Sequence, residues 1–204
     1  MIFEDIKLYL PKYLSSESDK ELFEGLKDFP ANLDSRMYTT FLQDEKTIFQ
    51  GDALSNLSIF NLPSTELKNG NCIVLSNTCD IDLNNTRFIP SQIVYAPILN
   101  LNKYRNKLLE IGFKPEQVNS HINSIKKQEI TQVFYLPSID NIFEESLVYL
   151  DRVINCPNNI IDREKLPENR IFSLSDYGAF LFLFKLSIHF TRIKDRVERR
   201  SVRL

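Results

Sequence analysis

The sequence predicts an α+β fold, in which a small, bent antiparallel sheet carries a helical insertion and a long helix closes the C-terminus. Short runs of β-branched and aromatic residues, separated by polar turns at 37–99 and 131–154, are typical of antiparallel strands. Residues 101–130 change to the apolar spacing of helices. At 173–200, a helix-starting Ser-x-x-Asp sequence precedes a stretch without proline.

The length and composition are those of one globular domain. The chain has 204 residues, of which 43% are hydrophobic and 25% charged, and a net charge of −2. These values exclude a disordered chain, a collagen and a disulfide-stapled mini-protein. We therefore expect a single domain over 1–204, in which residues 1–36 form a helical N-terminal appendage.

The sequence also predicts a cytoplasmic protein that binds no metal and no cofactor. Acidic residues come first at the N-terminus, where a secretory signal would carry positive charge. The longest apolar run, 179–184, is far shorter than the about 20 residues that span a membrane. Cys72, Cys79 and Cys156 form no CxxC pair, and two histidines add too few ligands for a structural zinc site.

One helix and five strands are expected before the insertion. Amphipathic residues 21–29 predict a short helix that Pro30 ends. Polar loops are expected at 63–70 and 76–87. Apolar and β-branched runs predict strands at 37–42, 46–49, 53–61, 72–75 and 92–99.

Helices at 102–111 and 115–128 make up the expected insertion, and two strands and the terminal helix follow it. Val118, Ile122 and Ile125 share one face of the second helix. The strands are expected at 131–136 and 147–153. A capping box from Ser173 to Asp176 then begins a helix over 173–200. Two polar residues of this region stand outside any motif: His121 and Arg152.

A stripe of basic residues lies along the second half of the terminal helix. Residues 185–204 contain seven Lys/Arg and two Asp/Glu, a local net charge of +5 on an acidic chain. The stripe predicts a contact surface for phosphate, RNA or an acidic protein. The alternative is a solvated face that suits the helix dipole or pairs with acidic surface of the same chain. Its members recur every three or four residues: Lys185, His189, Arg192, Arg196, Arg199 and Arg203.

The polar loop after the strand at 72–75 is the second candidate site. Cys79 lies next to Asp80, and a neighbouring carboxylate disfavours the thiolate, so a nucleophilic role needs a nearby cation. His189 is the candidate general acid or base, and Arg87 the candidate phosphate contact. The alternatives are an ordinary turn held by its own Asn and Asp side chains and a structural histidine. Asp80 and Asp82 alone are too few ligands to predict a magnesium site.

From residue 51 to residue 98, the order of features resembles the PemK/MazF-like growth-inhibitor toxins. Gly51-Asp52 precedes a strand and a polar loop. CIVLSN at 72–77 is similar to that family's apolar strand ending in Ser-Asn, and IVYAPI at 93–98 to its strand ending in a Pro-Ile pair. Residues 145–153 and 171–186 resemble a later strand and the terminal helix. The resemblance implies that the sheet closes into an SH3-like barrel.

The same resemblance implies cleavage of single-stranded RNA without a metal. Those toxins use an arginine just before the apolar strand and a Thr or Ser in the following loop. Here the arginine position falls at Gly70 or Asn71, Lys68 is the nearest cation, and Thr86 and Ser91 are the hydroxyl candidates. Because an arginine would stabilise the pentavalent phosphorane and none stands there, we expect a non-standard or inactive relative.

The layout also resembles a group of bacterial proteins with an LSNTCDI-type motif, which is residues 75–81 here. Two functions follow from these patterns. The first is binding of single-stranded RNA or another nucleic acid, in a pocket formed by the 77–87 loop with His189, Arg192 and Arg196.

The second function is that of a protein-interaction or regulatory subunit in a bacterial toxin–antitoxin or defence system, docked on an acidic partner. Exposure of the apolar face at 118–125 would favour this function. A hydrolase that uses Cys79 and His189 is a third and more distant alternative.

Overall fold

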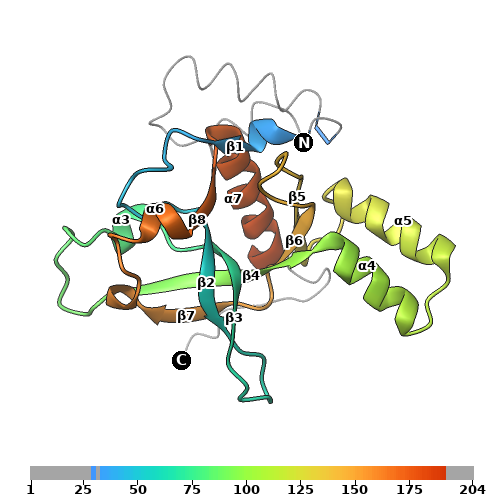
Figure 1. The fold of residues 1–204 in the computed structure, drawn as a ribbon, viewed down its shortest axis with the longest axis horizontal. Coiled ribbons are helices and arrows are strands. Elements are labelled where there is room, and N and C mark those ends of the chain that lie inside the picture. The colour runs from blue at the N-terminus through green and yellow to red at the C-terminus, as the bar shows by residue number, and fades with distance from the viewer. Residues whose placement is uncertain (1–28, 31–32, 192–204) are drawn as a thin grey trace, which may run out of the picture.

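Figure 1 shows an open antiparallel sheet with helices on both faces, in a computed structural model that describes residues 29–30 and 33–191. Hydrogen-bonded strands follow the order β1-β8-β2-β3-β4-β6-β5, and β7 pairs with β4. The predicted α+β class is confirmed. The strands are β1 (Tyr38–Thr39), β2 (Ala53–Ile59), β3 (Lys68–Val74), β4 (Gln92–Asn100), β5 (Val133–Leu136), β6 (Ser146–Tyr149), β7 (Ile154–Pro157) and β8 (Arg170–Leu174). The helices are α3 (Thr78–Ile81), α4 (Leu101–Glu110), α5 (Pro115–Lys126), α6 (Leu166–Asn169) and α7 (Asp176–Thr191), with short turns η2 (Ser35–Met37) and η3 (Asn158–Ile160).

β4 is the central strand and is paired along both edges. β3 lies on one edge, and β7 and β6 follow each other along the other. Ile98 lies opposite Val148 of β6, whereas Ile93 lies opposite Cys156 of β7. The partner strand therefore advances eight residues while β4 advances five, and three residues loop out. β6 and β7 are two pieces of one interrupted strand.

The sheet curls strongly but does not close into a barrel within the described residues. β2 and β7 are not hydrogen-bonded to each other, although Leu54 and Ile154 belong to one hydrophobic cluster inside the curl. β2 pairs with β8 only at Ala53 and Leu54. Of the two expected forms of the sheet, the structure has the open, bent one.

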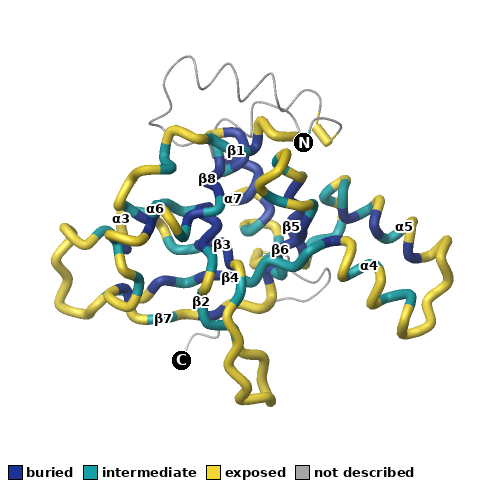
Figure 2. The backbone as a smooth tube through the Cα atoms, viewed as in Figure 1, coloured by how far each residue is buried: buried dark blue, intermediate teal, exposed yellow. Residues whose placement is uncertain are grey.

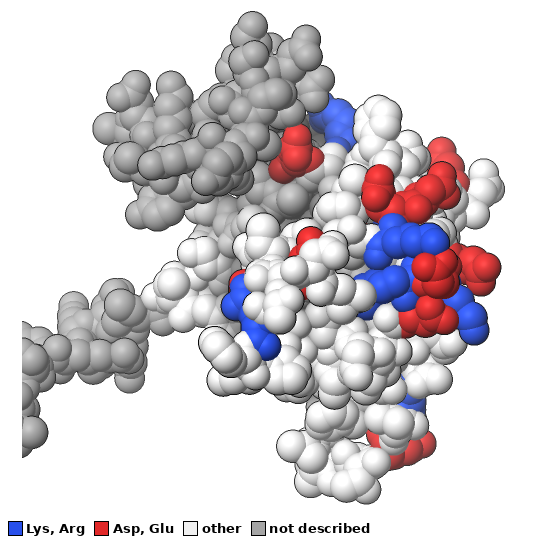
Figure 3. Space-filling model, turned by 90° about the vertical axis from the view of Figure 1, so that its left-hand side faces the viewer, with Lys and Arg blue, Asp and Glu red and all other residues white. Residues whose placement is uncertain are grey.

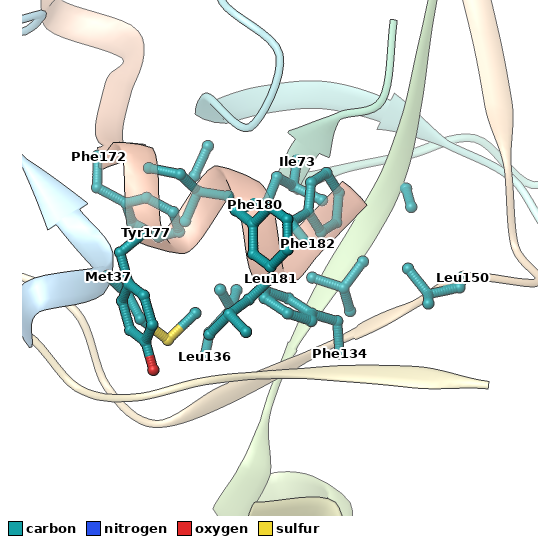
Figure 4. Packing of buried hydrophobic residues seen from close by; sticks show 14 residues of the cluster. Met37, Ile73, Phe134, Leu136, Leu150, Phe172, Tyr177, Phe180, Leu181 and Phe182 are labelled. Atoms are coloured by element: carbon teal, nitrogen blue, oxygen red, sulfur yellow. The ribbon is translucent and has the colours of Figure 1, made fainter. Parts of the chain in front are cut away.

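α7 covers one face of the sheet and forms the main core. In Figure 4 its aromatic side chains point toward β5 and β8, and the ring centroids of Phe182 and Phe134 are 5.1 Å apart. Burial of an apolar side chain of this size contributes about 1.5–3 kcal/mol. The expectation that the first half of the terminal helix is apolar and buried is confirmed.

The helical insertion covers the opposite face at the β5–β6 end of the sheet. Because successive strand side chains point to opposite faces, Phe134 of β5 packs on α7 and Tyr135 packs on the insertion. Every residue of β5 is consequently buried. Figure 2 shows the outer turns of α4 and α5 exposed and their inner sides covered. The apolar face of α5 is used inside the fold and presents no partner surface: Val118, Ile122 and Ile125.

The start of the terminal helix differs from the expected capping box. Ser173 lies in β8, and its hydroxyl donates to Asp52 Oδ1 at 2.5 Å. Ser175 caps α7 instead, since its Oγ accepts the Gly178 N–H at 3.2 Å. A Cβ at Gly178 would lie 2.1 Å from the Met37 carbonyl oxygen, so this helical position requires glycine.

The strand expected at 46–49 does not form, and a buried ion pair engages carbonyls of the 42–47 loop. The Arg170 and Asp52 side chains are fully buried, with Nη2 3.1 Å from Oδ2. The same guanidinium donates to the carbonyls of Leu42 (2.5 Å), Gln43 (3.0 Å), Glu45 (2.7 Å) and Thr47 (2.5 Å). These carbonyls turn inward to the charge and cannot form a ladder with a neighbouring strand.

Several other boundaries differ from the expected ones. The expected strand 147–153 is correct only in its first half, because residues 150–153 form the interruption between β6 and β7. The strand at 37–42 shortens to β1, and β3 begins four residues before the expected start at 72. α6 and β8 were not expected. The helix expected at 21–29 lies outside the described residues, except for its last position.

Among the described residues, no helix combines the length and apolar character needed to cross a membrane.

Candidate nucleic-acid interface

The 77–87 loop is a short helix held by local hydrogen bonds and an ion pair. Asn77 begins α3 by accepting the Cys79 N–H at 2.9 Å. Asp80 Oδ1 lies 2.5 Å from Arg87 Nη2, on side chains that are 63% and 44% exposed. The turn that the sequence offered as the alternative is thus present, and the phosphate-contact candidate Arg87 is engaged by a carboxylate.

Asn158 ties this loop to the end of β7. Its buried side chain donates to the Ile81 carbonyl and to Ser91 Oγ, both at 2.8 Å, and accepts from Arg163. Beside it lies a shallow cavity of about 250 Å³, bordered by Asp82 and Arg87. No motif marks Asn158 in the sequence, because its role depends on the approach of two loops about 70 residues apart.

The structure does not assemble Cys79, Asp80 and His189. Cys79 is a free, exposed thiol. Within residues 33–191, neither a hydrogen bond nor an ion pair joins His189 to Cys79 or Asp80. The His189 ring packs edge-on against Phe190 with centroids 4.8 Å apart, and Figure 1 shows α3 and α7 well separated. A nucleophile and its base must lie within hydrogen-bond reach, so this geometry lacks the pair.

Lys185 lies inside the protein instead of on a basic surface. The residue is 6% exposed, and its ammonium donates to the Gln128 carbonyl at the end of α5. Burial lowers its pKa to about 8. The arginines of the stripe lie outside the described residues: Arg192, Arg196, Arg199 and Arg203.

The positions that the toxin resemblance implies do not come together either. Lys68 pairs with Glu66 at 3.2 Å, and Ser91 accepts from Asn158. At Gly70, a Cβ would lie 2.7 Å from the Ile59 side chain, so an arginine there would displace Ile59. Thr86 is exposed in the loop. No hydrogen bond or ion pair among the described residues connects Lys68 with either hydroxyl.

A second group of polar and aromatic side chains gathers at the base of the helical insertion. The Arg152 guanidinium lies over the Tyr149 ring, 3.9 Å from its centroid. Tyr104 meets Tyr149 edge-on at 6.3 Å, and its hydroxyl hydrogen-bonds His121 Nε2 at 2.9 Å. We call this group the aromatic–basic cluster: Tyr104, His121, Tyr149 and Arg152. His121 and Arg152, which stand alone in the sequence pattern, are thereby brought together.

The interruption between β6 and β7 creates this cluster. Tyr149 is the last residue of β6, and Arg152 lies in the looped-out residues, so the chain folds Arg152 back over the ring. Burial raises the pKa of the Tyr104 and Tyr149 phenols, so both rings stay neutral at physiological pH. Neutral aromatic faces next to a guanidinium are groups on which nucleobases stack.

The insertion also differs in net charge from the rest of the described residues. Residues 101–130 contain six Lys/Arg and three Asp/Glu, a net charge of +3. The remaining described residues contain nine Lys/Arg and fifteen Asp/Glu, a net charge of −6. On the side of the molecule that faces the viewer in Figure 3, basic and acidic side chains are intermingled. In the insertion, three exposed lysines have no ion-pair partner within the described residues: Lys103, Lys114 and Lys127.

Polar contacts fix the insertion to the sheet. Gln128 pairs with the backbone of Tyr135, accepting its N–H at 3.2 Å and donating to its carbonyl at 2.9 Å. Glu145 Oε1 lies 2.6 Å from Lys126 Nζ and also accepts from the Tyr135 hydroxyl. Although burial acts in the other direction, these two contacts lower the pKa of Glu145. The Gln128 amide covers the edge strand β5, where an open edge would otherwise invite pairing with another chain.

A cavity of about 350 Å³ opens between α4 and α5 beside the cluster. Phe113, which is 53% exposed, and Gln117 border it together with Tyr104 and His121. The cavity is mostly apolar, and the hydrogen-bonded pair of Tyr104 and His121 forms part of its wall. It offers space for a flat group next to the Tyr104 and His121 side chains.

Comparison with known proteins adds no family to this geometry, since neither a protein-family model nor a curated protein matches the chain.

Proposed function

We propose that this protein binds single-stranded nucleic acid through the helical insertion and the aromatic–basic cluster. The observation that carries the proposal is the Arg152 guanidinium stacked on Tyr149 beside Tyr104 and His121, next to the insertion, whose residues 101–130 carry a net positive charge. Aromatic and guanidinium faces suit bases, and unpaired lysines suit phosphates. Single strands are favoured over duplexes because only unpaired bases expose their faces.

The terminal segment supports the same proposal. Residues 186–204 contain six Lys/Arg and two Asp/Glu, and they follow directly on Lys185, which contacts the end of α5. The described part of α7 therefore reaches the insertion through Lys185. We propose that Arg192, Arg196 and Arg199 add phosphate contacts, whereas Lys185 does not, because it is buried.

The test is fluorescence anisotropy with a labelled, mixed-sequence single-stranded RNA and with duplex DNA, using wild type, Arg152→Ala and Arg87→Ala. We expect Arg152→Ala to weaken RNA binding about 5- to 150-fold, the equivalent of one lost stacking contact. Arg87→Ala is the matched control, since Arg87 is also exposed but paired with Asp80. An unchanged affinity in Arg152→Ala, or no binding at low salt, contradicts the proposal. Loss of binding in Arg87→Ala alone would return the site to the 77–87 loop.

A regulatory subunit of a toxin–antitoxin or defence system is the alternative proposal, favoured by the apolar loop at 82–91. Leu83 is 60% exposed, Ile89 is 81% exposed and Phe88 is fully exposed, which is unusual for large apolar side chains on one short loop. Affinity purification from the native host should then recover a defined protein that Phe88→Asp loses and Ile142→Asp keeps. Recovery of the same proteins with both variants contradicts this alternative. Three free cysteines support a reducing, cytoplasmic location in either case.

A further inference from the structure

Two sheet edges remain unpaired on either side of the gap where a barrel would close. β2 pairs with β8 only as far as Leu54, so β3 is the single strand that pairs with residues 55–59. Side-chain contacts at this edge are the Ser55 hydroxyl, which donates to the Asn169 carbonyl at 3.2 Å, and the Ser58 carbonyl, which accepts from Tyr95. β7 pairs with β4 and with no other strand of the described chain. Unpaired edges carry free N–H and C=O groups that readily accept another strand.

A cavity of about 370 Å³ lies between these two edges. Tyr95 of β4 forms part of its wall and reaches across to donate to the Ser58 carbonyl at 2.8 Å. Its volume is within the range of ligand sites. Large apolar side chains line it together with three amides: Leu57, Phe60, Leu67, Ile160 and Ile161, with Asn56, Asn155 and Asn169.

The charge of this lining is unfavourable for a phosphate ligand. Asp162 is the one ionisable carboxylate among the lining residues, and they include no Lys or Arg. A nucleic-acid backbone would meet no cation there, in contrast to the insertion. The amides can hydrogen-bond a neutral main chain, because each carries both donors and an acceptor.

The β2 strand is locally distorted at this cavity. Asn56 has a φ of 67°, and the register with β3 shifts between Leu54 and Leu57. A bulge of this kind bends the strand and is frequent next to binding sites. Here it coincides with the point at which β8 leaves the edge of β2, so the bulge marks the end of the β2–β8 pairing.

We propose that this gap binds an extended, uncharged peptide of a partner protein, which adds as a strand to the β2 or β7 edge and inserts alternate apolar side chains into the cavity. Main-chain hydrogen bonds supply affinity in such strand addition, and pockets for alternate side chains supply specificity. The four residues of β7 match a peptide segment about 13 Å long. This site lies apart from the aromatic–basic cluster and shares no residue with it.

The probe is an acetylated and amidated octapeptide of alternating Thr and Val, titrated into the full-length, ¹⁵N-labelled protein and followed by NMR. We expect amide shifts at 55–59 or 154–157, with saturation near or below about 1 mM. The control is the same peptide N-methylated at alternate residues, which removes main-chain donors but keeps the side chains. We expect it to bind at least about tenfold more weakly.

Two variants separate the site from the rest of the surface. Ile160→Lys places a charge in the cavity at a residue that is 66% exposed, so the fold has little reason to change. Ile142→Lys is the matched control, at 64% exposure away from the cavity. We expect peptide binding to fall in the first and persist in the second, with RNA binding unchanged in both.

Three results overturn the proposal: no shifts up to about 1 mM, equal binding of the N-methylated peptide, or shifts confined to other residues. Because RNA binding is measured on the same variants, failure here leaves the nucleic-acid proposal standing, and the converse also holds.

Discussion

The two ends of the molecule use their charges differently. At the end with α3, α6 and the 40–49 loop, three cations are engaged by carboxylates: Arg170 by Asp52, Lys46 by Glu164 and Arg87 by Asp80. Lys165 is the exception at this end, since it is exposed and has no ion-pair partner among the described residues. At the end with α4 and α5, Lys103, Lys114 and Lys127 have no ion-pair partner in the part of the chain that the structure describes. A basic residue thus predicts a binding surface only where the fold leaves it exposed and unneutralised.

Breaking the buried pair at the first end should give the largest effect. Asp52→Ala leaves the fully buried Arg170 guanidinium without its carboxylate, which costs about 3–5 kcal/mol of unfolding free energy. Urea denaturation followed by circular dichroism measures this loss. Glu164→Ala is the control, since its pair with Lys46 is exposed and we expect a change of at most about 1 kcal/mol. Similar losses in the two variants would contradict an internal role for the buried pair.

The apolar face of α5 allows a second large effect at the other end. Ile125→Ala removes a side chain that is 1% exposed in the cluster under the insertion, and such truncations cost about 2–5 kcal/mol. Thermal unfolding measures it. Ile111→Ala, at a residue 60% exposed, should be nearly neutral. If Ile125→Ala were neutral and Ile111→Ala destabilising, the packing of α5 on β5 and β6 would be wrong.

Secondary structure was predictable where local pattern decides it, and the site was not. The period of apolar residues at 118, 122 and 125 sufficed to place α5 and its buried face. By contrast, the Arg152–Tyr149 stack arises from a three-residue interruption within a run that reads as one strand. The buried position of Lys185 depends on its hydrogen bond to the Gln128 carbonyl, which is 57 residues away in the sequence. Contacts of this separation leave no spacing signal in a single sequence.

The position of Lys185 predicts a pH dependence of stability. Its pKa is lowered to about 8 by burial, below the 10.5 of the free side chain, so between these values the folded chain binds fewer protons than the unfolded one. The contribution of Lys185 to the free energy of unfolding therefore rises between pH 8 and pH 10.5, by about 1–3 kcal/mol. We expect the stability of wild type relative to Lys185→Met to increase from pH 7 to pH 10. A difference that is flat or falls with pH would contradict the burial of this ammonium.

The smallest effect is expected at the exposed loop pair. Arg87→Ala removes an ion pair between half-exposed side chains, and such pairs contribute about 0.2–1 kcal/mol. Unfolding in guanidinium chloride should show a midpoint close to that of wild type. A loss above about 2 kcal/mol would mean that the loop is held by this pair, and not by Asn77 and Asn158.

The most direct test of the contrast between the two ends is the salt dependence of RNA binding. We would compare wild type with Lys103→Ala/Lys114→Ala/Lys127→Ala and with the control Lys46→Ala/Lys68→Ala/Lys165→Ala, which removes equal charge elsewhere. Each phosphate contact to a single strand contributes about 0.7 to the slope of log affinity against log salt. We expect the first variant to lose about 2 units of slope and the control to keep the wild-type value. Equal slopes in all three proteins, or a loss confined to the control, would contradict the assignment of nucleic-acid binding to the helical insertion.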